Sequence, residues 1–195
     1  MKFIAPLALA LALVAQPALS ACPTRADVDD GIVLVQNTPF FVRADIERTP
    51  EGMRLEQLIR TDLGTTRSAS LLAHAFAPLE TVTPEGITRY LYDGDPQVFD
   101  HIDQLGLYSL TATARRPDGE STQVTLDLRF EGHGHIDLAE CGYDTLYVRL
   151  RRIPATGPTE TSFLHFAPAL GLILAADGDA SFRYQWIGTA ADVAR

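Results

Sequence analysis

Lysine is nearly absent from this chain of 195 residues: Lys2 is its one lysine, and Asn37 is its one asparagine. Arginine is therefore the main cation, and the formal net charge is -9. Nucleic-acid binding needs a cluster of cations that neutralises phosphates. The acidic balance and the lack of a basic cluster exclude nucleic acid from the expected partners.

Long hydrophobic runs are also missing, apart from one near the start. Residues 3–15 form an apolar stretch that follows Lys2 and precedes the small residues at 18–21. A positive residue, an apolar core and a small-residue cleavage region are typical of a secretory signal peptide. The run is shorter than the apolar segment that a transmembrane helix needs to span a bilayer. We therefore predict a signal peptide at 1–21, followed by a single domain at 22–195 without a transmembrane span.

Cysteine occurs only twice, as Cys22 and Cys141. The tetrapeptide Leu19-Ser20-Ala21-Cys22 also fits a lipobox, in which Cys22 would carry acyl chains and anchor the protein in the outer membrane. The alternative is a periplasmic protein with a Cys22–Cys141 disulfide, since a lone thiol is unusual in an oxidising compartment. We prefer the disulfide, because one cysteine then accounts for the other, and lipidation stays open.

Apolar and polar residues alternate through most of the chain after residue 30. In "TQVTLDLRF", Val124, Leu126, Leu128 and Phe130 fall on one face, and "TLYVRLRR" and "FRYQWIG" repeat the pattern. A period of two predicts strands with one buried face. Such clean alternation is typical of antiparallel sheets, because parallel strands read as unbroken apolar runs.

Three loops share one turn chemistry, with proline second and glycine fourth, at 49–52, 83–86 and 116–119. This pattern predicts type I hairpin turns closed by a glycine bulge. Residues 51–64 could form a helix, but the preceding turn favours a strand, and residues 99–109 predict one short helical turn. The fold class is therefore all-β: an antiparallel meander of about ten strands, forming a wrapped sheet or an open barrel with few short helices.

The stretch "FLHFAPALGLILAADGDASFRYQW" (163–186) resembles the C-terminal hairpins of uncharacterised periplasmic proteins of Gram-negative bacteria. In these, an aromatic-x-Pro-x-Leu-Gly turn joins two strands, and the fold resembles the wrapped half-barrel of the lipoprotein carriers LolA and LolB. The resemblance covers this stretch alone. It implies an apolar concave face that holds a lipid or seats a partner protein.

One polar stretch, "FEGHGHIDLAEC", has the residue types of a metal site. Strand alternation places Glu131, His133, His135 and Asp137 on one face. Two imidazoles at i and i+2 with a nearby carboxylate can share a Zn²⁺ ion. The alternative, which we prefer, is that these residues form the solvent face of a strand and bind no ligand.

Other reactive residues suggest structural roles. The aspartates of "YDGDPQVFDHID" do not follow the EF-hand pattern and suit turns, and Arg149, Arg151 and Arg152 suit cross-strand pairing with acids. Nucleophile motifs such as Gly-x-Ser-x-Gly are absent from the sequence. We therefore expect no enzyme activity, no catalytic residues and no cofactor.

Two functions follow from these patterns. The first is an exported envelope protein that acts as a binding or carrier module for an apolar ligand or lipid. The second is a structural or assembly factor that contacts another envelope protein. This alternative includes a lipoprotein form in which Cys22 is lipidated. For the first, we expect inward residues of three strands to line the ligand: Leu126, Leu128, Leu146, Val148, Phe182 and Trp186.

Overall fold

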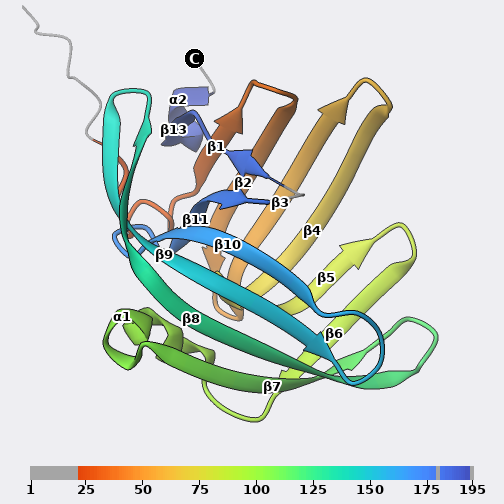
Figure 1. Ribbon diagram of the computed structural model, residues 1–195. Coiled ribbons are helices and arrows are strands. Elements are labelled where there is room, and N and C mark those ends of the chain that lie inside the picture. The colour runs from red at the N-terminus through yellow and green to blue at the C-terminus, as the bar shows by residue number, and fades with distance from the viewer. Residues whose placement is uncertain (1–21, 179–180, 194–195) are drawn as a thin grey trace, which may run out of the picture.

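The computed structural model describes residues 22–178 and 181–193, so the predicted signal peptide at 1–21 lies outside the described part. Within that part, a single 13-stranded antiparallel sheet forms, in the order β12-β11-β10-β9-β8-β7-β6-β5-β4-β3-β2-β1-β13 (Figure 1). Strands adjacent in sequence pair with one another from β1 to β12, which confirms the all-β meander. The sheet has more strands than predicted because its shortest strands span too few residues to show alternation.

The elements that build this sheet have the following bounds. The strands are β1 (Ile32–Gln36), β2 (Phe41–Thr49), β3 (Gly52–Thr61), β4 (Gly64–His74), β5 (Ala77–Thr83), β6 (Gly86–Tyr92), β7 (Leu107–Arg115), β8 (Ser121–Leu138), β9 (Cys141–Pro154), β10 (Glu160–Ala167), β11 (Leu172–Asp177), β12 (Phe182–Arg183) and β13 (Trp186–Thr189). A short helical segment, η1 (Pro96–His101) and α1 (Ile102–Leu105), lies where one helical turn was predicted, and α2 (Ala190–Val193) follows β13.

The three proline–glycine loops all form hairpins, but not of one kind. The loop after β7 has the predicted bulged form: the Arg116 N–H donates to the Glu120 carbonyl at 2.8 Å, and Gly119 has φ +87°. The loops after β2 and β5 are one residue tighter, because Thr49 pairs directly with Gly52, as Thr83 does with Gly86. At Gly52 an added Cβ would lie 2.5 Å from the Leu72 carbonyl oxygen, so the tight turn requires glycine.

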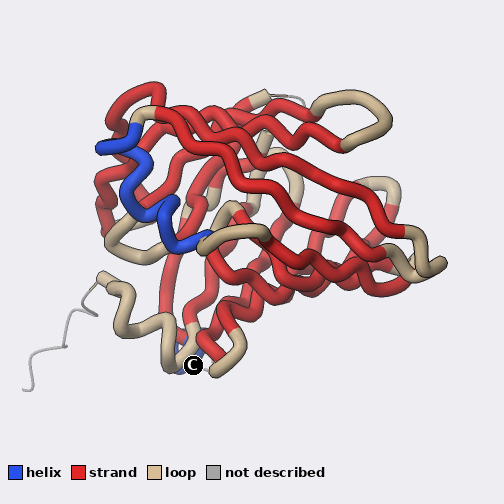
Figure 2. The backbone as a smooth tube through the Cα atoms, turned by 90° about the horizontal axis from the view of Figure 1, so that it is seen from below, coloured by secondary structure: helices blue, strands red, loops and turns tan. Residues whose placement is uncertain are grey.

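The sheet curls so that its two halves face each other (Figures 1 and 2). Strands β8 and β9, of 18 and 14 residues, are long enough to contribute to both halves of the interior. One buried cluster joins β1–β4 to β11 and the far end of β8. A second joins β7–β10 to the helical segment, with Phe76, Phe99 and Phe166 fully buried in it. The apolar face of the sheet is thus buried against itself, as a one-sided sheet requires.

The C-terminal segment connects the two ends of the strand order. The Tyr184 N–H donates to the Leu174 carbonyl of β11 at 3.1 Å, and the next N–H, of Gln185, donates to Val35 of β1 at 2.8 Å. Strand β12 therefore extends one end and β13 the other, and these two strands do not pair with each other. The sheet is open, and the segment between β12 and β13 spans the opening.

A disulfide joins Cys22 to Cys141, which confirms the preferred pairing. The bridge links residues 119 apart in sequence and fixes the first described residues to the start of β9. Beside it, the Tyr143 hydroxyl donates to the Pro23 carbonyl at 2.9 Å. Such a bond persists in an oxidising compartment. Among the described residues, no helix has the length and apolar character needed to cross a bilayer.

Candidate functional site

A cavity of about 450 Å³ lies against the inner face of β6–β9. Alternation brings Tyr90 and Tyr92 of β6 to this face, together with Ala112 and Ala114 of β7. Tyr90 is the register partner of Ala114, and Tyr92 is that of Ala112. Val124 and Leu126 of β8 continue the wall. The resulting surface combines two aromatic rings with small side chains, and small residues leave the space that the cavity occupies.

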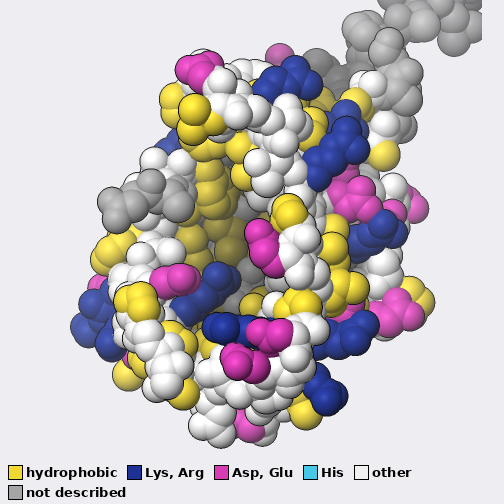
Figure 3. All heavy atoms as spheres, turned by 90° about the vertical axis from the view of Figure 1, so that its right-hand side faces the viewer, with side chains coloured by type: hydrophobic (Ala, Val, Ile, Leu, Met, Phe, Trp, Pro, Cys, Tyr) yellow, Lys and Arg dark blue, Asp and Glu magenta, His cyan; other side chains and the backbone are white. Residues whose placement is uncertain are grey.

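A second cavity, of about 380 Å³, lies between the two halves of the sheet. One wall comes from β1–β4 and the other from β9, β11 and β12; half-buried lining residues are Leu55, Ala75, Ile173 and Phe182. Arg152 lines both cavities, so we treat them together as the inner trough. Figure 3 shows this side of the molecule hollowed, with hydrophobic side chains on the walls and charged side chains around the mouth.

Two tyrosines of the inner trough, Tyr92 and Tyr184, have raised pKa values. Burial raises the pKa of Tyr92 well above its usual range, although the charge of Arg152 opposes the rise, and its hydroxyl donates to the Pro78 carbonyl at 2.9 Å. Burial raises the pKa of Tyr184 to about 12, and the Gln57 amide donates to its hydroxyl at 3.4 Å. The arginine and acidic side chains that line the trough are Arg116, Arg152 and Glu160.

The six residues expected to line a ligand divide into three groups. Leu126 and Phe182 line the inner trough. Leu128, Leu146 and Val148 are at most 6% exposed and belong to the second buried cluster, so they pack against protein. The ring of Trp186 lies over Gly188 on β13, while its neighbour Ile187 is the residue buried in the core.

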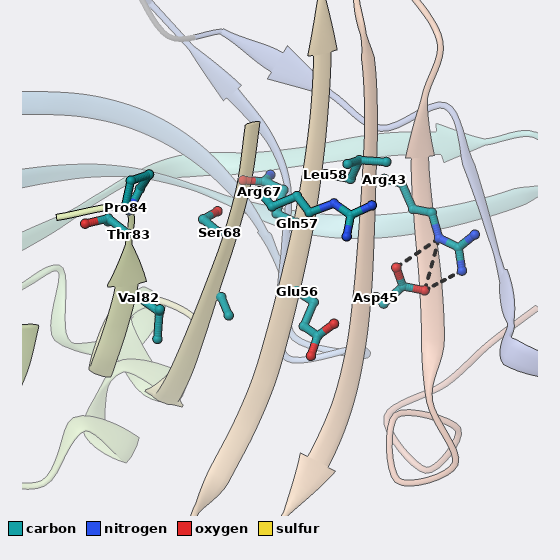
Figure 4. Close-up of a pocket in the computed structure, with 11 residues that line it drawn as sticks. Arg43, Asp45, Glu56, Gln57, Leu58, Arg67, Ser68, Val82, Thr83 and Pro84 are labelled. Carbon is teal, nitrogen blue, oxygen red and sulfur yellow. Dashed lines mark hydrogen bonds and ion pairs between the residues drawn. The ribbon is translucent and has the colours of Figure 1, made fainter. Parts of the chain in front are cut away.

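A shallow depression of about 620 Å³ lies on the outer face of β2–β5 (Figure 4). Two of its charged residues, Arg43 and Asp45, occupy alternate positions of β2 whose neighbours Val42 and Ala44 are buried. Arg43 makes a bidentate ion pair with Asp45, with nitrogen–oxygen distances of 2.6–3.1 Å. The pairing raises the pKa of Arg43, so this charge is already satisfied within the protein.

The four candidate metal residues of β8 are all exposed, but a bulge between Phe130 and Gly132 interrupts the alternation on which their shared face was predicted. His135, however, pairs through Nδ1 with Asp144 at 2.9 Å and through Nε2 with Asp137 at 3.3 Å. His133 contacts the Phe130 ring, and Glu131 pairs with Arg149 at 3.3 Å. No group of three or more histidine, cysteine or acidic residues within 22–178 and 181–193 is arranged to hold a metal ion.

The acidic turn and the arginine cluster have structural partners. Asp95 caps η1 by accepting the Gln97 N–H at 2.9 Å, and Asp93 accepts the Thr111 N–H at 3.1 Å. Arg151 pairs with Asp127 across the outer face at 3.5 Å. Arg152 differs, because it lies on the inner face. Period-two alternation along β9 indicates the inward position of Arg152 in the sequence itself, since Val148, Leu150 and then Arg152 occupy successive inward positions.

Comparison with known proteins adds no identity. No protein-family model matches the chain, and neither the curated proteins nor the solved structures contain a match. The resemblance drawn from residues 163–186 is therefore supported only as far as a large antiparallel β-sheet.

Proposed function

We propose that this protein is a non-catalytic binding or carrier module of the bacterial envelope, for an apolar ligand or lipid. The observation that carries the proposal is the inner trough, where an inward face built mainly from apolar and aromatic residues is not filled by its own side chains. Cavities of about 300–1,000 Å³ with mostly apolar walls are typical of small-molecule sites.

Two further features support this proposal. The Cys22–Cys141 disulfide and the signal-like residues 1–21 agree with an exported protein in the periplasm. The likeness of residues 163–186 to proteins of the lipoprotein-carrier half-barrel type agrees with an apolar cargo. We place no chemical step in the trough, because its charged groups do not include an activated nucleophile or an acid–base pair.

A neutral environment-sensitive dye, N-phenyl-1-naphthylamine, tests the proposal directly. We expect its fluorescence to rise on binding and to be displaced by lipid, and native mass spectrometry of protein from the periplasm should show bound lipid. Substitution of Ala112→Leu would narrow the cavity against β6–β9 and should weaken dye binding, whereas Thr113→Leu on the outer face serves as its control. A protein that binds neither dye nor lipid contradicts the proposal.

A second candidate function, a structural or assembly factor, is favoured by exposed apolar residues on the outer face of β5 and β6. Val82, Ile87 and Leu91 are 39%, 41% and 76% exposed, and Val82 is the register partner of Ile87. Exposed apolar patches mark contact surfaces between proteins. Cross-linking in the envelope distinguishes this role, since a partner should be captured from this face even when Ala112→Leu narrows the trough.

A further inference from the structure

We propose that the inner trough takes a long-chain carboxylate, such as a fatty acid, and that Arg152 binds its head group. This inference rests on the proposed binding function and specifies the class of ligand. Its starting point is the position of an arginine on an inward face where the pattern calls for an apolar residue.

Arg152 continues a buried row of β9. Val148 and Leu150, the two preceding residues of that row, are 0% and 4% exposed. The register partner of Arg152 on β8 is Leu126, which is 3% exposed. Arg152 itself is exposed, and it lines both cavities of the inner trough.

The guanidinium of Arg152 has no ion pair or hydrogen bond to another side chain among the described residues. Its register partner on β10 is Glu160, but the two side chains do not form an ion pair. The arginines on the outer side of the same strand behave differently, because Arg149 pairs with Glu131 and Arg151 with Asp127. Arg152 is thus available to a ligand.

The charge balance of the trough favours a head group with one negative charge. Arg116 and Arg152 supply two cations, and Glu160 supplies one anion. A guanidinium matches a carboxylate in a bidentate, charge-assisted geometry. From Arg152, the cavity between the sheet halves offers an apolar path along Leu55, Ile173 and Phe182 for an acyl chain. A carboxylate amphiphile satisfies both parts of the trough at once.

Displacement of bound N-phenyl-1-naphthylamine by palmitate and by its methyl ester tests the head-group contact. In the wild-type protein, palmitate should bind about tenfold or more tightly than the ester, since a charge-assisted hydrogen bond is lost in the ester. Arg152→Leu should remove this preference and leave ester binding unchanged, and Arg152→Lys should keep part of it. Arg115→Leu, on the outer face of β7, is the matched control and should behave as wild type.

The outcomes separate the two proposals. Equal binding of acid and ester, with Arg152→Leu changing neither, overturns the head-group inference and leaves the binding function intact. Failure of dye, acid and ester to bind overturns the binding function itself. Tighter, Arg152-dependent binding of a lysophosphatidate of the same chain length overturns the choice of a carboxylate. If Arg152→Leu does not fold, the salt dependence of binding by the wild-type protein provides the test. Added NaCl should weaken palmitate binding and leave binding of the methyl ester unaffected.

Discussion

His74 Nε2 lies 3.3 Å from Asp100 Oδ1 inside a group of phenylalanine rings. Nδ1 of the same ring accepts the Phe76 N–H at 3.3 Å, so the ring proton is on Nε2 and points at the carboxylate. The His74 side chain is 3% exposed. Arg25 reaches the other oxygen of Asp100 at 3.2 Å, so this pair links β4, η1 and the N-terminal segment.

The Asp100 contacts predict a loss of stability in acid. Hydrogen bonding from His74, with a contribution from Arg25, lowers the pKa of Asp100 from 3.8 to about 2. A lowered folded-state pKa stabilises the protein above the unfolded value, and this contribution disappears as the pH falls from 3.8 to about 2. Asp100→Asn should cost about 1–3 kcal/mol at neutral pH. Urea unfolding of wild type and variant across this pH range should show their difference shrinking in acid, with exposed Asp62→Asn unchanged.

The disulfide should contribute strongly to stability. It closes a loop of 119 residues, for which the chain-entropy model gives about 4–5 kcal/mol. Reduction of the wild type should therefore lower the urea midpoint. The midpoint of Cys141→Ala should already be low, and reductant should not change it. Intact mass with thiol labelling of the unreduced protein provides the chemical check. An acylated Cys22 or a labelled Cys141 would contradict the bridge and restore the lipid-anchored alternative.

His135 should titrate above the ordinary histidine range. The hydrogen bond that His135 donates to the Asp144 carboxylate is the main cause that raises its pKa above 6.5, and Asp137 adds to it. A raised folded-state pKa stabilises the protein below pH 6.5, and this effect is lost as the pH rises through the folded value. An NMR titration should show a lower pKa in Asp144→Asn and a smaller decrease in Asp137→Asn. No change in either variant would disprove the pairing. In the same samples, Zn²⁺ broadening of His133 and His135 signals would revive the metal hypothesis.

The buried cluster and the inner trough should respond differently to truncation. Leu128 is 0% exposed, so Leu128→Ala should cost about 2–5 kcal/mol and leave dye affinity unchanged. Leu55 is half-buried and lines the cavity, so Leu55→Ala should cost less stability and weaken dye binding. Urea unfolding and dye titration on the same samples measure the stability and the dye affinity of each variant. The reverse pattern would mean that the trough is part of the core.

Alternation in the sequence was enough to predict the antiparallel sheet, and the cysteine count favoured the disulfide while leaving lipidation open. Alternation could not predict the trough, because a period of two identifies the inward face of a strand but not whether protein or a cavity lies against that face. Leu126 and Leu128 show this: they are neighbours on one face, yet Leu126 borders a cavity and Leu128 packs against protein. At Trp186 the alternation is interrupted, because the chain crosses between the ends of the sheet at Tyr184 and Gln185.

The crossing by residues 182–189 also bears on how the chain folds. Strand β1, among the first elements made, finds its second neighbour only in β13, near the end of the chain. Until those last residues arrive, the outer edge of β1 stays unpaired, and unpaired edges recruit other chains. Pairing across so long a separation is slow to form. Until β13 pairs with it, the edge of β1 is therefore a site at which partly folded copies of the chain can aggregate.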